Sequence, residues 1–228
     1  MKIAGLQKTT LLDYPGKVAC TVFLPGCNLR CPFCHNGSLV FNPGEGNLSR
    51  EELLAFLTKR RGVLDGVCVT GGEPTLYPDL PELLGQIRSL GYAVKLDTNG
   101  TNPQMLQFIL EQGLVDYVAM DIKSSPWQYE TLCGGIDVLD SVRQSAALLM
   151  GSGVDYEFRT TCVHPFHTPE QMVPIGQWLS GAKRYFLQGF VDSGDLVGQG
   201  TWALSKAEME ALRQAVLPYI PDTQLRGV

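Results

Sequence analysis

The feature of this sequence that most constrains its fold is the alternation of short apolar runs with longer stretches of helical pattern. Strands that alternate with helices in this way predict βαβ units and a parallel sheet. The apolar runs are Val18–Phe23, Gly66–Thr70, Ala93–Asp97, Tyr117–Ile122, Tyr156–Val163 and Tyr185–Gln188. Within 228 residues, six such units predict an α/β fold, either a doubly wound sheet or an incomplete (βα)6 barrel resembling a TIM barrel.

The helical stretches between these runs have recognisable ends. Ser49 with Glu52 is typical of a capping box, and Gly91 and Gly113 are typical of helix C-termini. The predicted helices are Arg50–Lys59, Leu80–Leu90, Pro103–Gln112, Val138–Met150, Pro169–Leu179 and Lys206–Val216. Because no repeat or linker interrupts the pattern, we expect a single domain over residues 1–228. Its core should span about 16–190, and residues 191–228 form a C-terminal extension without a motif that we can interpret.

Composition narrows the functional classes. Hydrophobic residues make up 44% and charged residues 18%, so a sizeable core can be buried. The net charge of -5 comes from interspersed charges without a basic face, so no nucleic-acid partner is expected. The apolar runs are too short for a membrane span, and the N-terminus lacks the apolar stretch of a signal peptide. We therefore expect a cytoplasmic protein without membrane contact.

Unusual polar residues follow the predicted strands where each one ends. In a parallel sheet these ends share one edge, which is where α/β enzymes place their active sites. The segments concerned are the cysteine loop after Pro25, Gly71–Pro74, Thr98–Gly100, Asp121–Lys123 and the region of His164. The sequence therefore predicts one rim that collects cysteines, carboxylates, amides and cations.

Cys27, Cys31 and Cys34 have the spacing C-x3-C-x2-C within a polar loop. An odd total of seven cysteines in a reducing compartment argues against a disulfide framework. Thiolates are the usual ligands of iron–sulfur clusters, and three of them on a [4Fe–4S] cluster leave one iron open to bind a substrate.

A zinc site is the alternative for this loop. It would require a fourth ligand, and His35 is the nearest candidate. However, adjacent residues in an extended loop point apart, which disfavours ligation by both Cys34 and His35. The other cysteines divide into three expected core residues and one whose role stays open: Cys20, Cys68 and Cys162 lie in apolar runs, whereas Cys133 lies beside two glycines.

CNLRCPFC, with GGEP, DTNG and MDIK further along the chain, resembles the radical S-adenosylmethionine (SAM) superfamily. The N-terminal part is most similar to the glycyl-radical-enzyme activating enzymes. Among these it resembles the longer form of the anaerobic ribonucleoside-triphosphate reductase activating proteins. The resemblance runs from about residue 3 to about residue 190. It implies an incomplete (βα)6 barrel with the cluster on Cys27, Cys31 and Cys34.

The resemblance also implies the walls of a SAM site. Phe33 matches the position that packs against the adenine, with a simple loop anchor as the alternative. Gly71, Gly72 and Glu73 match the motif that receives the methionine amino group, with an ordinary strand-to-helix turn as the alternative. Arg159 matches an arginine that contacts the SAM carboxylate.

Two further motifs are implied to lie at the rim. Asp97 and Asn99 would contact SAM, and Lys123 would meet its carboxylate or ribose. Asp97, Thr98, Asp121 and the carbonyl of Ala119 are implied to hold a monovalent cation, the alternative being salt bridges from Lys123. His164 and His167 serve either the substrate or an ordinary loop role.

The resemblance implies reductive cleavage of SAM at the cluster and abstraction of a hydrogen atom by the resulting 5'-deoxyadenosyl radical. The expected substrate is a glycine of a glycyl radical enzyme, an anaerobic ribonucleotide reductase, with flavodoxin or ferredoxin as electron donor. Three alternatives stay open. They are an activase of a pyruvate formate-lyase-like enzyme, an enzyme acting on a small molecule such as 7-carboxy-7-deazaguanine synthase, and a zinc-stabilised binding module without catalysis.

Overall fold

The computed structural model describes residues 2–41 and 48–228. All of the predicted strands are present, with ends that differ by at most one residue from the apolar runs. The strands are β1 (Lys2–Ile3), β2 (Gly5–Thr10), β3 (Ala19–Leu24), β4 (Leu48–Ser49), β5 (Gly66–Gly71), β6 (Ala93–Thr98), β7 (Tyr117–Asp121), β8 (Asp155–Cys162), β9 (Tyr185–Gly189) and β10 (Thr223–Arg226). The sequence pattern missed β1, β2, β4 and β10, which are short or largely polar.

The predicted helices are also present to within one residue. Ser49 and Glu52 form the predicted capping box, and Asn102 caps its helix by accepting a hydrogen bond from the backbone N–H of Met105. The helices are α1 (Gly37–Phe41), α2 (Arg50–Lys59), α3 (Leu80–Ser89), α4 (Pro103–Glu111), α5 (Tyr129–Leu132), α6 (Leu139–Gly151), α7 (Pro169–Trp178) and α8 (Lys206–Val216), with 3₁₀ turns at Pro74–Leu76 and Pro126–Gln128. The short helices α1 and α5 were not predicted.

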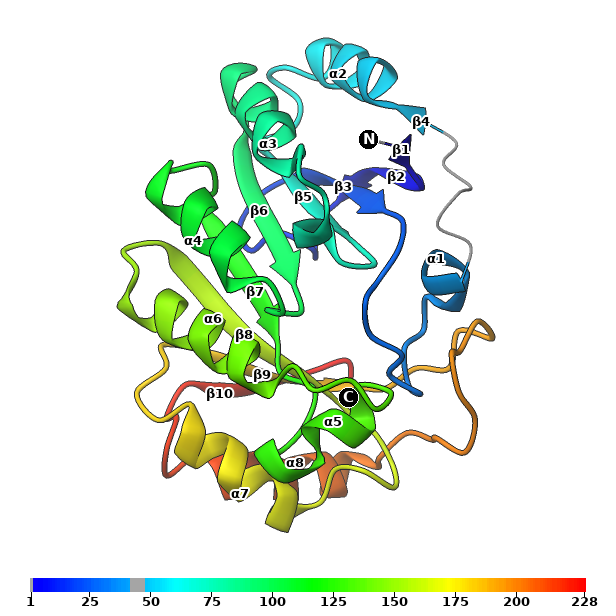
Figure 1. Cartoon of the computed structure of the whole chain (residues 1–228), viewed down its shortest axis with the longest axis vertical. Helices are drawn as coiled ribbons and strands as arrows, with labels where there is room; N and C mark the ends of the chain where they lie inside the picture. The colour runs from blue at the N-terminus through cyan, green and yellow to red at the C-terminus, as the bar shows by residue number, and fades with distance from the viewer. Residues whose placement is uncertain (1, 42–47) are drawn as a thin grey trace.

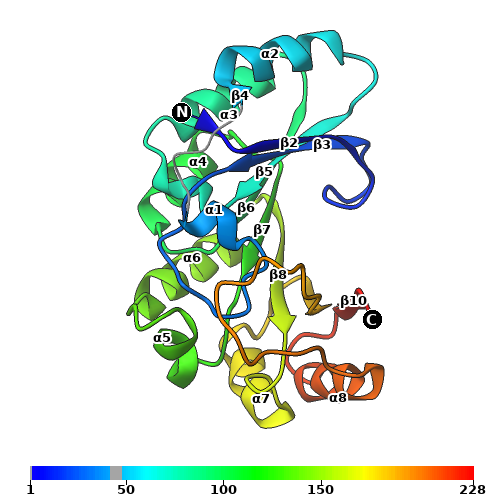
Figure 2. The same cartoon turned by 90° about the vertical axis from the view of Figure 1, so that its right-hand side faces the viewer.

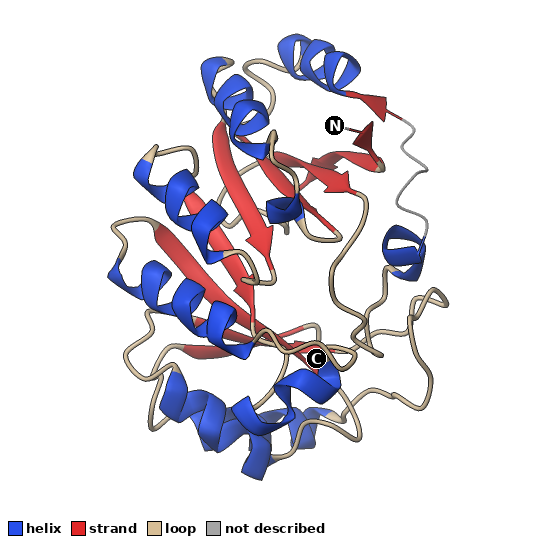
Figure 3. Cartoon of the chain, viewed as in Figure 1, coloured by secondary structure: helices blue, strands red, loops and turns tan. Residues whose placement is uncertain are grey.

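One curved sheet organises the molecule, with the strand order β10-β9-β8-β7-β6-β5-β3-β2. Every neighbouring pair is parallel except β2 with β3, which is antiparallel. The main helices lie along the outer side of this sheet, as Figures 1 and 3 show. In the described part of the chain the sheet ends at β2 and β10 without joining them, so the predicted incomplete barrel is confirmed. It gains one parallel strand, β10, beyond the six that were expected.

Side chains alternate along each strand between a helix-covered face and the barrel interior. On β6, Val94 and Leu96 are fully buried in the main apolar core, whereas Lys95 and Asp97 belong to the opposite face. The same alternation on β8 separates Phe158, in the apolar core, from Arg159. The polar residues of the interior are therefore a consequence of strand period, and they lie where a ligand cavity can use them.

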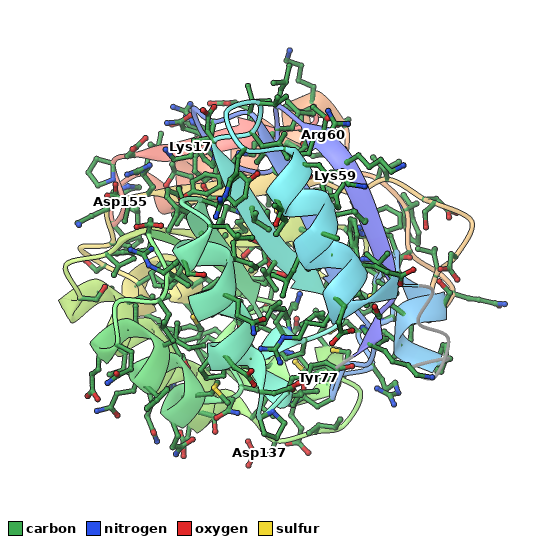
Figure 4. The ribbon with its side chains drawn as sticks, turned by 90° about the horizontal axis from the view of Figure 1, so that it is seen from above. Lys17, Lys59, Arg60, Tyr77, Asp137 and Asp155 are labelled. Carbon is green, nitrogen blue, oxygen red and sulfur yellow. The ribbon has the colours of Figure 1, made fainter. Side chains whose placement is uncertain are left out.

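The two ends of the barrel are distinct. In Figure 4, Tyr77 and Asp137 lie beyond the carboxyl ends of β5 and β7. Lys17 and Asp155, which lie at the amino ends of β3 and β8, are on the opposite side of that view. The cysteine loop leaves β3 at its carboxyl end, so it lies at the end of the barrel where parallel-strand enzymes bind their ligands.

Candidate active site

A cavity of about 480 Å³ lies at the carboxyl ends of the strands. This volume is in the range of small-ligand sites. Apart from Ala119, which does not line it, the residues that the sequence singled out for cofactor or metal binding all do: Cys27, Cys31, Phe33, Cys34, Gly71, Gly72, Glu73, Asp97, Thr98, Asn99, Asp121, Lys123 and Arg159. They come from the ends of four strands, β5 to β8, and from the cysteine loop. Their convergence depends on the tertiary fold, because they span more than half of the sequence.

The cysteine loop begins at Gly26, whose φ of 83° lies in the left-handed region that favours glycine. Cys31 is almost fully buried, while Cys27 and Cys34 are partly exposed. The neighbouring Cys133 thiol lowers the pKa of Cys31, whereas burial raises the pKa of Cys27 to about 11. Cys133, whose role the sequence left open, is buried beside Cys31.

In the described part of the chain, no three His, Cys, Asp or Glu side chains gather around a point that could hold a single metal ion. The three cysteines line one cavity without converging on one centre. A [4Fe–4S] cluster binds its thiolates at separate irons, so this donor set and the open space beside it fit a cluster of that kind.

Gly71 and Gly72 hold the start of the cysteine loop through the backbone. Gly72 N donates to Leu24 O at 2.8 Å, and Glu73 N donates to Gly26 O at 2.8 Å. A Cβ on Gly72 would lie 1.9 Å from Gly26 O, which excludes any other residue without a backbone shift. These glycines are therefore needed where two backbones meet, a reason that the motif alone did not reveal.

Glu73 is completely buried beside this contact. Its Oε1 accepts hydrogen bonds from Thr98 Oγ1 at 2.7 Å and from the backbone and hydroxyl of Thr75. Its Oε2 accepts from Asn99 N at 2.6 Å. Burial raises the pKa of Glu73, although these donors oppose the shift. The carboxylate is thus locked in one orientation at the cavity wall.

A chain of paired charges forms the opposite part of the cavity. Arg159 Nη1 lies 3.0 Å from Asp97 Oδ2, and Arg159 Nε lies 2.9 Å from Asp121 Oδ1. Lys123 Nζ lies 3.0 Å from Asp121 Oδ2, and the buried Lys95 is bonded to Asp97. Burial alone would raise the pKa of both carboxyl groups, but Arg159 and the lysines hold both pKa values below their usual range. Three cations and two carboxylates leave one net positive charge.

This network bears on the implied monovalent cation. Asp97 and Asp121 are bonded to cationic side chains of the chain itself, and the Thr98 hydroxyl is bonded to Glu73. The salt bridge between Lys123 and Asp121, considered from the sequence, is present. The cation on Asp97, Thr98 and Asp121 stays a prediction.

Asn99 and Phe33 connect the rim to the cysteine loop. Asn99 Nδ2 lies 3.8 Å from the sulfur of Cys27 and 3.0 Å from Asn28 Oδ1. N–H groups directed at a ligating sulfur are among the contacts that tune iron–sulfur clusters. The Phe33 ring lines the cavity and packs edge-on against His167, with the ring centroids 5.9 Å apart.

The two histidines after β8 have different roles. His167 is buried, its Nδ1 accepts from Val163 N at 3.2 Å, and its Nε2 lies 3.1 Å from Lys123 O. It therefore supports Phe33 and the backbone of Lys123 from behind the cavity wall. His164 lies outside the cavity, where it stacks on Trp202 and is bonded to Glu208.

Lys95 belongs to this network of paired charges, and the sequence pattern did not single it out. It lies in an apolar run and its side chain is buried, so it was counted with the core strand. The signal was present, because Lys95 and Asp97 are two residues apart on a strand and must share a face. Gln7 of β2 and Gln188 of β9 also line the cavity, which therefore extends towards the open side of the sheet.

Comparison with known proteins identifies the family to which this partial barrel with its cysteine-lined cavity belongs. The model of the radical SAM superfamily matches residues 21–179, and the chain therefore belongs to that superfamily and is a radical SAM enzyme. A protein of Methanocaldococcus jannaschii assigned as a glycyl-radical enzyme activating enzyme is 30% identical over 82% of this chain and 79% of its own length.

Other curated relatives match over shorter stretches. The 7-carboxy-7-deazaguanine synthase of Neisseria meningitidis is 35% identical over 56% of this chain, and the pyruvate formate-lyase-activating enzyme of Clostridium pasteurianum is 34% identical over 56% of it. In both cases the match covers 54% of the relative.

Solved structures share the fold at low identity. SuiB of Streptococcus suis has a TM-score of 0.67 at 18% identity, covering 91% of this chain and 49% of SuiB. Coproporphyrinogen III oxidase of Escherichia coli has a TM-score of 0.59 at 12% identity, covering 91% of this chain and 53% of the oxidase. The chain therefore spans about half of these enzymes. No helix among the described residues is both long and apolar enough to cross a membrane.

Proposed function

We propose that this radical SAM enzyme generates a glycyl radical on a partner protein, an anaerobic ribonucleoside-triphosphate reductase, and receives electrons from flavodoxin or ferredoxin. A glycyl radical enzyme as the partner is supported by the similarity to the M. jannaschii protein, which extends over most of both chains. A protein substrate is also supported by the open side of the sheet, because the cavity extends to the exposed Gln7 on edge strand β2.

The observation that carries the SAM site is the charge arrangement beside the three thiols. Glu73 offers a carboxylate on one wall, and the cluster of Lys95, Arg159 and Lys123 retains one net positive charge on the other. An amino acid end, with one ammonium and one carboxylate, is complementary to this pair of walls. Arg159 has five N–H donors, and its Nη2 bonds to no acceptor within residues 2–41 and 48–228.

The roles of the chain's residues follow from that arrangement. Cys27, Cys31 and Cys34 would hold three irons of a [4Fe–4S] cluster, and Asn99 would direct its amide N–H at the Cys27 sulfur. Glu73 would receive the methionine amino group of SAM, Arg159 and Lys123 its carboxylate, and Phe33 would pack against the adenine. When bound, cluster and SAM together supply reductive carbon–sulfur cleavage and hydrogen-atom abstraction.

The test is anaerobic reconstitution followed by reduction with dithionite in the presence of SAM. We expect bound iron and sulfide, methionine formation, and a glycyl radical by EPR only when the reductase is added. Replacing Cys27, Cys31 or Cys34 by Ser should abolish iron binding. Cys20→Ala should retain it, because Cys20 is buried in the apolar core away from the cavity.

Action on a small molecule is the second candidate, and it is favoured by the matches to 7-carboxy-7-deazaguanine synthases. Formation of 7-carboxy-7-deazaguanine by the reconstituted enzyme without any partner would support it and count against glycyl radical formation. A zinc-loaded protein that cleaves no SAM would overturn both proposals.

A further inference from the structure

Residues 193–198 of the C-terminal region run alongside residues 32–38 of the cysteine loop and its following helix. We call residues 193–198 the strap. In Figures 1 and 2 this orange segment lies beside the blue segment that leads from β3 to α1. Gly198 N donates to Pro32 O at 2.9 Å, and Val197 N donates to Cys34 O at 3.1 Å. The strap thus binds the backbone on both sides of the last cysteine.

Asp195 forms the central anchor of the strap. Its carboxylate accepts from Ser38 N, at 3.0 and 2.9 Å, and from Ser38 Oγ at 2.7 Å. Its backbone carbonyl accepts from Gly37 N at 2.8 Å, and Ser193 Oγ adds a bond of 2.8 Å to His35 O. These contacts involve the loop and the first two residues of α1, and none of them uses a cysteine sulfur.

The contact is close enough to require glycine on both sides. A Cβ on Gly37 would lie 2.9 Å from Asp195 O, and a Cβ on Gly198 would lie 2.6 Å from the Cβ of Pro32. Asp195 O is a backbone atom and the Cβ of Pro32 is fixed in the proline ring, so side-chain rotation cannot relieve either contact. The two segments therefore pack closely at both of these positions.

The cysteine loop has few bonds of its own, such as Cys34 N to Cys31 O at 3.0 Å. A polar loop of this kind loses much conformational freedom when its three sulfurs must be held in one arrangement. Bonds from a segment 157 residues away in sequence restrict the loop before any cluster is bound. Restriction of this kind lowers the population of locally opened states.

We propose that the strap, with Asp195 as its positioning residue, holds the cysteine loop in the conformation that receives and retains the cluster. This inference rests on the proposed role of Cys27, Cys31 and Cys34 as cluster ligands. It gives the extension after residue 190 a function that the sequence did not reveal. Asp195 does not line the cavity, so it acts through the loop.

The test compares Asp195→Ala with Asp192→Ala in the full chain. Asp192 lies in the same region, but its carboxylate accepts only from Gly194 N within that region. The first measurement is the reaction of the metal-free protein with a thiol reagent, with each cysteine quantified by mass spectrometry. We expect D195A to increase the reactivity of Cys34 several-fold and to leave the reactivity of the buried Cys162 unchanged. In D192A, the reactivity of Cys34 should equal the wild-type value. D195N, which keeps one acceptor oxygen, should lie between D195A and the wild type.

The second measurement is the rate at which a chelator removes iron from the reconstituted protein, followed by loss of cluster absorbance. D195A should lose iron several-fold faster. If no variant binds iron, the cluster proposal fails while the thiol result still reports on the strap. Should D195A fail to fold, Ser38→Ala removes the same hydroxyl contact from the other side. Changes within about twofold of wild type in both measurements, the range of an ordinary surface substitution, would overturn the strap proposal.

Discussion

Asp97 on β6 and Arg159 on β8 are bonded at 3.0 Å across the strand that separates them. Side chains from alternate strands meet in this way inside barrels because each strand directs every second residue inward. Asp121 on the intervening strand completes the set through its own bond to Arg159. This layer of the barrel interior therefore consists of paired charges, whereas most barrels have apolar side chains there. The stability of the fold should depend on these ion pairs.

Replacing Arg159 by Met should therefore be costly. It leaves two carboxylates, Asp97 and Asp121, with less compensating charge, and breaking a buried pair typically costs about 3–5 kcal/mol. Urea unfolding of the metal-free protein measures this loss. Arg143→Met is the matched control, because its pair with Asp140 is exposed and 3.8 Å long, worth at most about 0.5 kcal/mol. Equal losses in the two variants would refute the role of the charge network.

Gly72→Ala should destabilise the contact between the cysteine loop and the strand that follows it. The added Cβ would lie 1.9 Å from Gly26 O, so one backbone must move, at a cost of about 2 kcal/mol or more. Gly85→Ala is the opposite case. Gly85 lies inside α3 with no atom closer than 3.9 Å to the new Cβ, and we expect stabilisation by about 0.5–1 kcal/mol. Thermal or urea unfolding should give opposite signs for the two alanines.

His167 should make stability depend on pH. Burial lowers the pKa of His167, so the folded protein keeps the ring neutral while the unfolded chain binds a proton below about pH 6.5. Its contribution to stability is therefore complete above that pH and is lost as the pH falls towards the lower folded value. Unfolding free energies measured between pH 7.5 and pH 5 should decline less steeply in His167→Gln than in the wild type.

Phe166→Leu is the control for that measurement. Phe166 packs against Phe33 in the same cluster, but it carries no titrating group. It should lower stability by a similar amount at each pH. An H167Q curve parallel to the wild type would show that the neutral ring of His167 is not the source of the pH dependence.

Arg226 on β10 is predicted to secure the last strand of the barrel. Its two terminal nitrogens lie 2.7 and 2.9 Å from the oxygens of Glu157, which is nearly fully buried. Arg226→Met leaves that carboxylate without its cation and should cost about 3 kcal/mol. Adding Glu157→Gln in the same chain should recover part of the loss, because the buried charge is removed. A double variant no more stable than R226M would argue against the pair as the cause.

The sequence by itself determined the elements whose signals are local. Helix α2 was predicted residue for residue, because its capping box lies within four positions of the chain, and the strands of the barrel were visible as apolar runs. The cysteine spacing and the motifs at the strand ends also named many of the residues that line the cavity, although not Gln7 or Gln188. Strand β2 was missed because GLQKTT lies at an edge, where exposure removes the apolar pattern.

Only the tertiary structure decided how those residues are paired. The bonds from Arg159 to Asp97 and Asp121, from Glu73 to Thr98, and from Asp195 to Ser38 join side chains 25 to 157 positions apart. Residue type and spacing do not specify such partners, since the energy of a bond depends on distance and burial, which exist only once the sheet has curved. The same reason explains why the C-terminal region, in which the sequence showed no motif, forms hydrogen bonds to the cysteine loop and supplies β10 of the barrel.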